Sequence, residues 1–264
     1  GGGNYSSGSI FEHCRVEYGG SYSNLVVVGA PYINSCTFTN NQGDGVVGAY
    51  RSGDPVKITN STFTQNDAVA IYNPSDATIT GNTITYNKQG IVGGDTCYTL
   101  TCLHEIRAIA AWGATTITDN VITHNTRASY ARPAGGIWVE LDSYQNGSVV
   151  TISGNQISDN GSSGVSISMQ SNGTYTVTIS GNTIVRNTGG GIKGSSGPGS
   201  TLNITNNYIA DNAAGSGGGI RATGTGNINV SYNRIHGNSI NESLDVRGGS
   251  ALWIHDSTSS TLIA

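Results

Sequence analysis

Apolar and polar residues alternate over short stretches of this chain, and one such stretch recurs. In residues 176–192, TVTISGNTIVRNTGGGI, Ile179 and Ile184 flank Asn182, and Asn187 and a glycine run follow. The same order occurs upstream in VVTISGNQISDNGSSGV and downstream in TLNITNNYIADNAAGSGGGI. The apolar positions alternate with period two and do not form a helical stripe, so each repeat is predicted to contain short β-strands.

The spacing of the repeats predicts how these strands are arranged. Most neighbouring repeats begin 21 to 27 residues apart, whereas the steps from Ile79 to Ile117 and from Ile117 to Ile152 are 38 and 35 residues long. Three short strands in every ~20–27 residues are typical of a parallel β-helix, whose coils stack roughly 4.8 Å apart. The first buried position of each coil is expected at Ile33, Ile58, Ile79, Ile117, Ile152, Ile179, Ile204 and Val230, after a degenerate coil around residues 11–16.

We therefore predict an all-β protein with one single-stranded parallel β-helix domain over residues 1–264. It should have about nine coils, with loop insertions near residues 93–105 and 126–135. Neither terminal segment, GGGNYSSGS or TSSTLIA, looks like a helix that could cover an open end of the stack. Because bare coil ends are adhesive strand edges, we expect a fragment of a larger exported protein, with end-to-end self-association as a further prediction.

Asparagines recur at two fixed positions of the repeat and are expected to form its corners. Asparagine tolerates left-handed backbone angles, and stacked amides can bond one another from coil to coil. Cys14 and Cys36 hold the first-corner position in their own coils, so a disulfide between them and a reduced buried pair are both open. The first corner contains Asn82, Asn120, Asn155, Asn182, Asn207 and Asn233, and the second contains Asn87, Asn125, Asn160, Asn187, Asn212 and Asn238.

The segments ITGNTI, ITDNVI, ISGNQI, ISGNTI and ITNNYI give the chain a family resemblance. Over residues 9–256 it resembles the right-handed parallel β-helix proteins of the pectate-lyase-like superfamily. The resemblance implies a right-handed solenoid. It does not select an activity, because that superfamily includes polysaccharide lyases, glycoside hydrolases, epimerases, phage tailspikes and adhesins.

Composition narrows the classes of partner. The net charge is −4 and no basic stripe occurs, which argues against binding of nucleic acid. No apolar run is long enough to span a membrane. Cys97 and Cys102 lie in the first insertion, five residues apart, and a disulfide there would stiffen a loop. Disulfides belong to exported proteins, so we expect a secreted or cell-surface location.

Candidate chemistry gathers on the third strand of each coil. The residue after its first buried position should face solvent, because side chains alternate along a strand. Between Gly94 and Trp138, either Arg107 or Ala110 is expected at this outward position, with Trp112 close by. The outward row reads Tyr72, Val92, Trp138, Ser166, Lys193, Arg221 and Trp253, and two residues further along lie Pro74, Gly94, Glu140, Ser168, Ser195, Thr223 and His255.

This row predicts a groove for a polysaccharide, because exposed aromatic rings suit sugar rings and a solenoid repeats them along one line. The alternative is a solvated strand face on which aromatic residues are favoured by β-propensity. The predicted substrate-binding residues are Trp138, Trp112, Trp253, Tyr72, His255 and Arg107.

Lys193 and Arg221 are the first catalytic candidates. They occupy equivalent positions on successive coils, so each cation should lower the pKa of the other. Lys193 could then remove the proton alpha to a uronate carboxylate, while Arg221 stabilises the charge that develops. The pair is similar to the Lys/Arg arrangement of chondroitinase-B-like lyases, although no RHG sequence follows Arg221. Two solvated surface cations are the alternative.

Glu140 and Asp142 are the second candidates. Their i, i+2 spacing places both carboxylates on one face of a strand, where they could bind calcium. They could also act as a hydrolytic pair, which needs carboxyl groups roughly 5–9.5 Å apart. Two solvated acids are the alternative.

These observations favour an extracellular carbohydrate-active domain that binds an acidic polysaccharide, and they leave open whether it also cleaves the polymer, by elimination or by hydrolysis. The NTD, DD and GHG motifs of polygalacturonases are absent, so no complete catalytic signature supports turnover. The alternative is a non-enzymatic surface, adhesin or filament-forming module. Low charge and the many Gly, Ser, Thr and Asn residues are compatible with that alternative.

Overall fold

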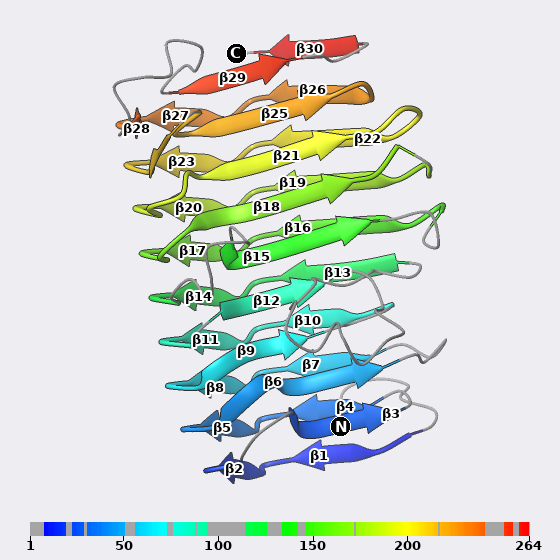
Figure 1. Ribbon diagram of the computed structural model, residues 1–264, viewed down its shortest axis with the longest axis vertical. Helices are drawn as coiled ribbons and strands as arrows, with labels where there is room; N and C mark the ends of the chain where they lie inside the picture. Colours follow the sequence, from blue (N-terminus) through cyan, green and yellow to red (C-terminus); the bar gives the residue numbers. More distant parts are fainter. Residues whose placement is uncertain are drawn as a thin grey trace.

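The chain folds into a solenoid of short parallel strands, shown in a computed structural model (Figure 1). Within the described residues there is no helix, and therefore none long and apolar enough to cross a membrane. The structure describes residues 8–19, 23–28, 31–50, 56–72, 76–87, 89–93, 114–125, 134–141, 146–171, 173–215, 217–240, 251–255 and 259–263.

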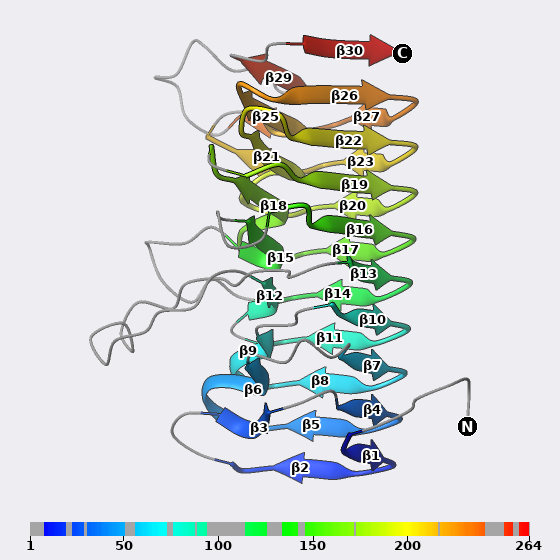
Figure 2. The same cartoon turned by 90° about the vertical axis from the view of Figure 1, so that its right-hand side faces the viewer.

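Three long parallel sheets, here called A, B and C, run the length of the solenoid, and β1 and β30 lie at its opposite ends (Figures 1 and 2). Sheet A contains β1 (Ile10–Glu12), β4 (Tyr32–Asn34), β7 (Lys57–Thr59), β10 (Thr78–Thr80), β13 (Ala114–Thr118), β16 (Val149–Ser153), β19 (Thr176–Ser180), β22 (Thr201–Thr205), β26 (Asn227–Ser231) and β30 (Ser259–Ile263).

Sheets B and C have nine strands each, which agrees with the predicted number of coils. Sheet B contains β2 (Arg15–Glu17), β5 (Thr37–Thr39), β8 (Thr62–Thr64), β11 (Thr83–Thr85), β14 (Val121–Thr123), β17 (Gln156–Ser158), β20 (Thr183–Val185), β23 (Tyr208–Ala210) and β27 (Arg234–His236). Sheet C contains β3 (Ser23–Val28), β6 (Gln42–Tyr50), β9 (Asp67–Tyr72), β12 (Gln89–Gly93), β15 (Ala134–Leu141), β18 (Ser163–Met169), β21 (Ile192–Ser196), β25 (Ile220–Gly224) and β29 (Leu252–His255). A small extra sheet pairs β24 (Ala213–Ala214) with β28 (Ser239–Ile240).

The core consists of stacked apolar rows, one on the inner face of each sheet. In sheet A the predicted marker positions are register partners from Phe11 to Val230, and Leu262 continues the row. In sheet B, Phe38 and Phe63 stack with ring centroids 4.7 Å apart. Alternating burial along each strand follows from the alternating sequence, so this part of the prediction is confirmed.

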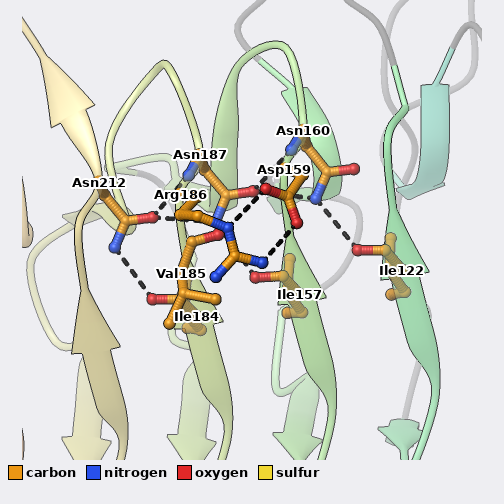
Figure 3. A network of polar contacts seen from close by, with 9 residues as sticks. All are labelled: Ile122, Ile157, Asp159, Asn160, Ile184, Val185, Arg186, Asn187 and Asn212. Atoms are coloured by element: carbon orange, nitrogen blue, oxygen red, sulfur yellow. Dashed lines mark hydrogen bonds and ion pairs between the residues drawn. The ribbon is translucent and has the colours of Figure 1, made fainter.

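Two ladders of buried asparagine amides form the corners, as predicted. Figure 3 shows the second ladder, in which the Asn187 Nδ2 group donates to Asn212 Oδ1 at 3.0 Å and to the Ile157 carbonyl at 3.2 Å. Backbone N–H groups join the ladder too: that of Asn160 donates to Asn187 Oδ1 at 3.1 Å. Each amide therefore satisfies the polar groups that a sharp bend would leave unpaired inside the protein.

The left-handed backbone lies one residue earlier than the sequence suggested. The ladder asparagines do not have positive φ angles; the residue before each one does, for example Asp159 at 57° and Arg186 at 55°. Asparagine is selected at the corner for its side-chain hydrogen bonds. The residue before it adopts the left-handed conformation that the turn requires, and this residue is a glycine at positions 154 and 181.

In several coils a glycine follows the second corner and has a packing role. A Cβ on Gly164 would lie 2.6 Å from Ile184 Cγ2 and 2.9 Å from the Gly191 carbonyl oxygen. A Cβ on Gly191 would lie 2.5 Å from the next carbonyl, that of Gly219. In these coils only a residue without a side chain fits so close to the next coil, whereas Ala70 holds the equivalent position in β9.

The first ladder ends in cysteines, and the choice left open for them is resolved. The backbone N–H of Cys14 donates to Cys36 Sγ at 3.4 Å, so both residues hold the ladder position. Both are free thiols, which excludes the disulfide. Burial is the main reason that the pKa of Cys36 is raised, so its thiol form is favoured at neutral pH. Ser61 fills the same ladder position between Cys36 and Asn82.

Candidate functional site

The outer face of sheet C brings the predicted row of side chains together. Trp138 is the register partner of Ser166, Ser166 of Lys193, Lys193 of Arg221, and Arg221 of Trp253. The second row is also in register, from Glu140 through Ser168, Ser195 and Thr223 to His255. A prediction based on alternation alone therefore placed both rows correctly in this part of the sheet.

One predicted coil does not exist. Val92 pairs directly with Trp138, so β12 and β15 are neighbours in sheet C. No strand that would give Arg107 or Ala110 an outward position can lie between two strands that bond each other. The prediction was wrong because the long interval between Gly94 and Trp138 was interpreted as containing an additional strand of sheet C. In the structure Asn82 donates directly to Asn120, so these two residues belong to adjacent coils.

Trp138 is less open than the predicted groove requires. Its exposed fraction is 8%, and that of its neighbour Ser166 is 7%. An indole of this size becomes that buried only when other atoms pack over its faces. It therefore cannot serve as an open platform for a sugar ring in this state, and the accessible part of the row lies further along, from Lys193 to Trp253.

The Arg221 side chain is the most distinctive feature of that accessible part. Its guanidinium carbon lies 4.7 Å from the centre of the Trp253 ring, a cation–π contact. The backbone of the preceding turn lies close to the base of the Arg221 side chain, because a Cβ on Gly217 would lie 2.7 Å from Arg221 Cβ. The Nε–H group is buried without a hydrogen-bond partner, which is costly for a charged donor. Lys193 lies beside Arg221 in the next strand, and Trp253 contacts His255 at 5.8 Å between ring centroids.

The carboxylate pair is only partly described. Glu140 lies half-buried near the end of β15, while Asp142 lies outside the described residues. In the part of the chain that the structure describes, no three His, Cys, Asp or Glu side chains gather as a metal site would require. Arg107, Trp112, Cys97 and Cys102 also lie outside the described residues, and of Tyr72 only the backbone is described. Apart from the position of Arg107 in the row, which the pairing of β12 with β15 excludes, their predicted roles remain predictions.

A second group of polar contacts lies on the corner between sheets B and C and was missed. Arg186 donates to both carboxylate oxygens of Asp159 at 2.7 Å, one coil away (Figure 3). Further along the same corner, Tyr86 and His124 stack at 4.9 Å. All four are left-handed residues that precede ladder asparagines, so the repeat itself marks these positions.

Removal of Arg186 is expected to raise the pKa of Asp159. The hydrogen bonds from Arg186 are the main reason that this pKa is lowered from its ordinary value near 3.8, and burial opposes them. A lowered carboxyl pKa stabilises the fold above the unfolded-state value of ~3.9 and loses that effect as pH falls through the folded-state value. Because the Arg186 side chain is 57% exposed, the contribution of the pair should stay below about 1 kcal/mol.

NMR titration of the Asp159 carboxyl carbon in Arg186→Gln tests this expectation. An Asp159 titration midpoint that is unchanged from the parent protein would contradict it. Tyr232→Gln, a change at an exposed left-handed residue in front of the first ladder, is the control and should leave the titration unaltered.

Comparison with known proteins identifies only the architecture. A family model described as a right handed beta helix region matches residues 3–175 and, in a second match, residues 135–263. Comparisons with curated proteins and with solved structures found no match. The ligand must therefore be inferred from the side chains on the outside of the coils.

Proposed function

Because the chain belongs to the right-handed β-helix family, whose shared coils leave function to the outward side chains, we propose that sheet C binds an acidic polysaccharide outside the cell. The binding residues are Lys193, Arg221, Trp253 and His255. An extended solenoid face suits a chain-like ligand, since equivalent positions recur at each coil.

The observation that carries this proposal is the register that places Arg221 between Lys193 and Trp253 on the outer face of sheet C. A guanidinium forms strong charge-assisted hydrogen bonds with carboxylates, and each uronate sugar supplies one carboxylate. Lys193 in the adjacent strand adds a second positive charge. Trp253 offers an apolar surface beside them for the sugar ring.

The same residues include the groups that a β-elimination needs. Lys193 would take the proton alpha to the carboxylate, and Arg221 would stabilise the resulting negative charge. Collapse of that charge would form the carbon–carbon double bond and break the bond from the β carbon to the glycosidic oxygen, which would leave with a proton returned by Lys193 or supplied by water. Glu140 and Asp142 would supply only part of the oxygen ligands of a calcium ion, and the substrate carboxylate and water would have to supply the others. Binding of the polymer does not depend on elimination, and the two are measured separately.

Calorimetry against a panel of uronate polymers tests binding, with a neutral glucan as the control. We expect affinity for at least one acidic polymer, weakening as salt is added, because exposed charges are screened. Absorbance of the unsaturated product, followed with and without calcium, reports elimination independently. Binding without product would retain the binding site and reject lyase action, whereas absence of binding to every acidic polymer would reject the proposal.

A further inference from the structure

The outer face of sheet A carries a regular array of small hydroxyl and amide side chains. Along β10, β13, β16, β19, β22 and β26, two outward positions are occupied in every strand, and each residue is half-buried. The register keeps both columns straight from coil to coil. The first column is Thr78, Thr116, Thr151, Thr178, Asn203 and Asn229, and the second is Thr80, Thr118, Ser153, Ser180, Thr205 and Ser231.

This face differs from sheet C in charge. None of the residues in these six strands of sheet A is ionisable, whereas sheet C presents Lys193, Arg221, Glu140 and His255. An uncharged face fits an uncharged partner, and it would be a poor match for the acidic polymer that sheet C is proposed to bind. The two faces are therefore built for different partners.

The array is also rigidly spaced. Neighbouring strands lie about 4.8 Å apart and alternate residues of one strand roughly 6.6 Å apart, so the side chains form a rectangular grid. The strands of sheet A lie directly above one another in both views (Figures 1 and 2), as expected of a sheet held flat by side-chain ladders. Some hydroxyls bond along the column, as in Thr80 to Thr118 and, at 3.3 Å, Ser231 to Thr205.

We propose that this face binds the surface of ice. The two spacings of the grid are close to the repeats of oxygen atoms on the prism faces of hexagonal ice. Threonine hydroxyls can hold waters at those positions, and their methyl groups fill the space between. Each contact is weak, but a flat face that engages many lattice points at once adds them together.

Growth of single ice crystals in the presence of the purified chain tests this proposal. We expect faceted crystals, a measurable gap between melting and growth temperatures, and slower recrystallisation of frozen solutions. Thr151→Lys, which places a charge at the middle of the grid, should remove most of the gap. Thr223→Lys, the same change on the outer face of sheet C, should leave it intact.

Melting temperatures of both variants show whether either has lost its fold. If Thr151→Lys has lost its fold, Thr151→Val is measured in its place, because it adds no charge. Rounded crystals with the parent protein at every concentration would overturn the proposal. Equal losses from correctly folded Thr151→Lys and Thr223→Lys would overturn it too. Retention on insoluble cellulose or chitin without any effect on ice would assign the face to a crystalline polysaccharide instead. Because these readouts do not involve Arg221, they are independent of the outcome for sheet C.

Discussion

Asn182→Ala is expected to destabilise the protein by about 3–5 kcal/mol, since it leaves several buried polar groups without partners. The Asn182 side chain is 1% exposed. Its Oδ1 atom accepts from the backbone N–H and the Nδ2 group of Asn155, at 3.0 and 2.9 Å. Its Nδ2 group donates to Asn207 Oδ1 and to the Ile152 carbonyl, both at 2.9 Å. The same Nδ2 group also donates to the Ser180 carbonyl at 3.1 Å, and alanine can replace none of these five bonds.

Asn203→Ala is the matched control for that experiment. Asn203 also lies among stacked coils, but it points outward from sheet A and is half-buried, with Asn229 donating to it at 2.9 Å. Its loss should cost no more than about 0.5 kcal/mol. Urea unfolding of both variants gives the comparison, with a second transition in Asn182→Ala as further support, because solenoids can unfold in parts. Equal destabilisation of the two variants would show that the ladder bonds contribute no more than surface amides.

Arg221→Ala is expected to weaken binding of the acidic polymer by ~10–100-fold, which corresponds to roughly 1.4 kcal/mol per factor of ten. The loss is expected to be large because the guanidinium is held against the Trp253 ring, which fixes its position before the polymer binds. Arg221→Lys should recover only part of the affinity, since an ammonium group cannot reproduce the planar donor fork. Titration calorimetry with the best polymer of the panel measures both changes.

Arg234→Ala controls for the loss of one positive charge. Arg234 is exposed on sheet B, with its guanidinium 5.6 Å from the Tyr208 ring, so it resembles Arg221 in chemistry but lies on another face. Its removal should leave affinity unchanged. If Arg221→Ala and Arg234→Ala weaken binding equally, the polymer responds to net charge and the sheet C site is wrong. If elimination is detected, Lys193→Ala should abolish it while the protein stays folded.

The fold could be predicted almost completely, because each coil repeats the same pattern of buried apolar residues and corner asparagines. Ile152, Ile179 and Ile204 are buried because alternation places them inside, and Asn155 and Asn182 are buried because only their amides satisfy the corner. A repeat supplies this information many times over. The position of left-handed φ was misplaced by one residue, since tolerance of an angle and the need for a hydrogen bond can each account for an asparagine.

The site was predicted less well, because outward side chains are not constrained by the repeat. Alternation gave the order from Trp138 to Trp253, yet it could not show that Trp138 is covered or that Arg221 has a buried donor. Both facts depend on neighbours that are distant in sequence. The Asp159–Arg186 pair could have been found from sequence by reading down the residues in front of the second ladder.

One last consequence follows from how the coils close. The amide of Asn82 reaches Asn120 at 3.0 Å across 38 residues, and that of Asn182 reaches Asn207 at 2.9 Å across 25. The asparagine ladder therefore keeps the same hydrogen bonds whatever the length of the loop between two successive coils. Such a scaffold can accept foreign peptides at these exit points, and it offers protein engineers a straight rod on which inserted epitopes or enzymes could be displayed at chosen heights.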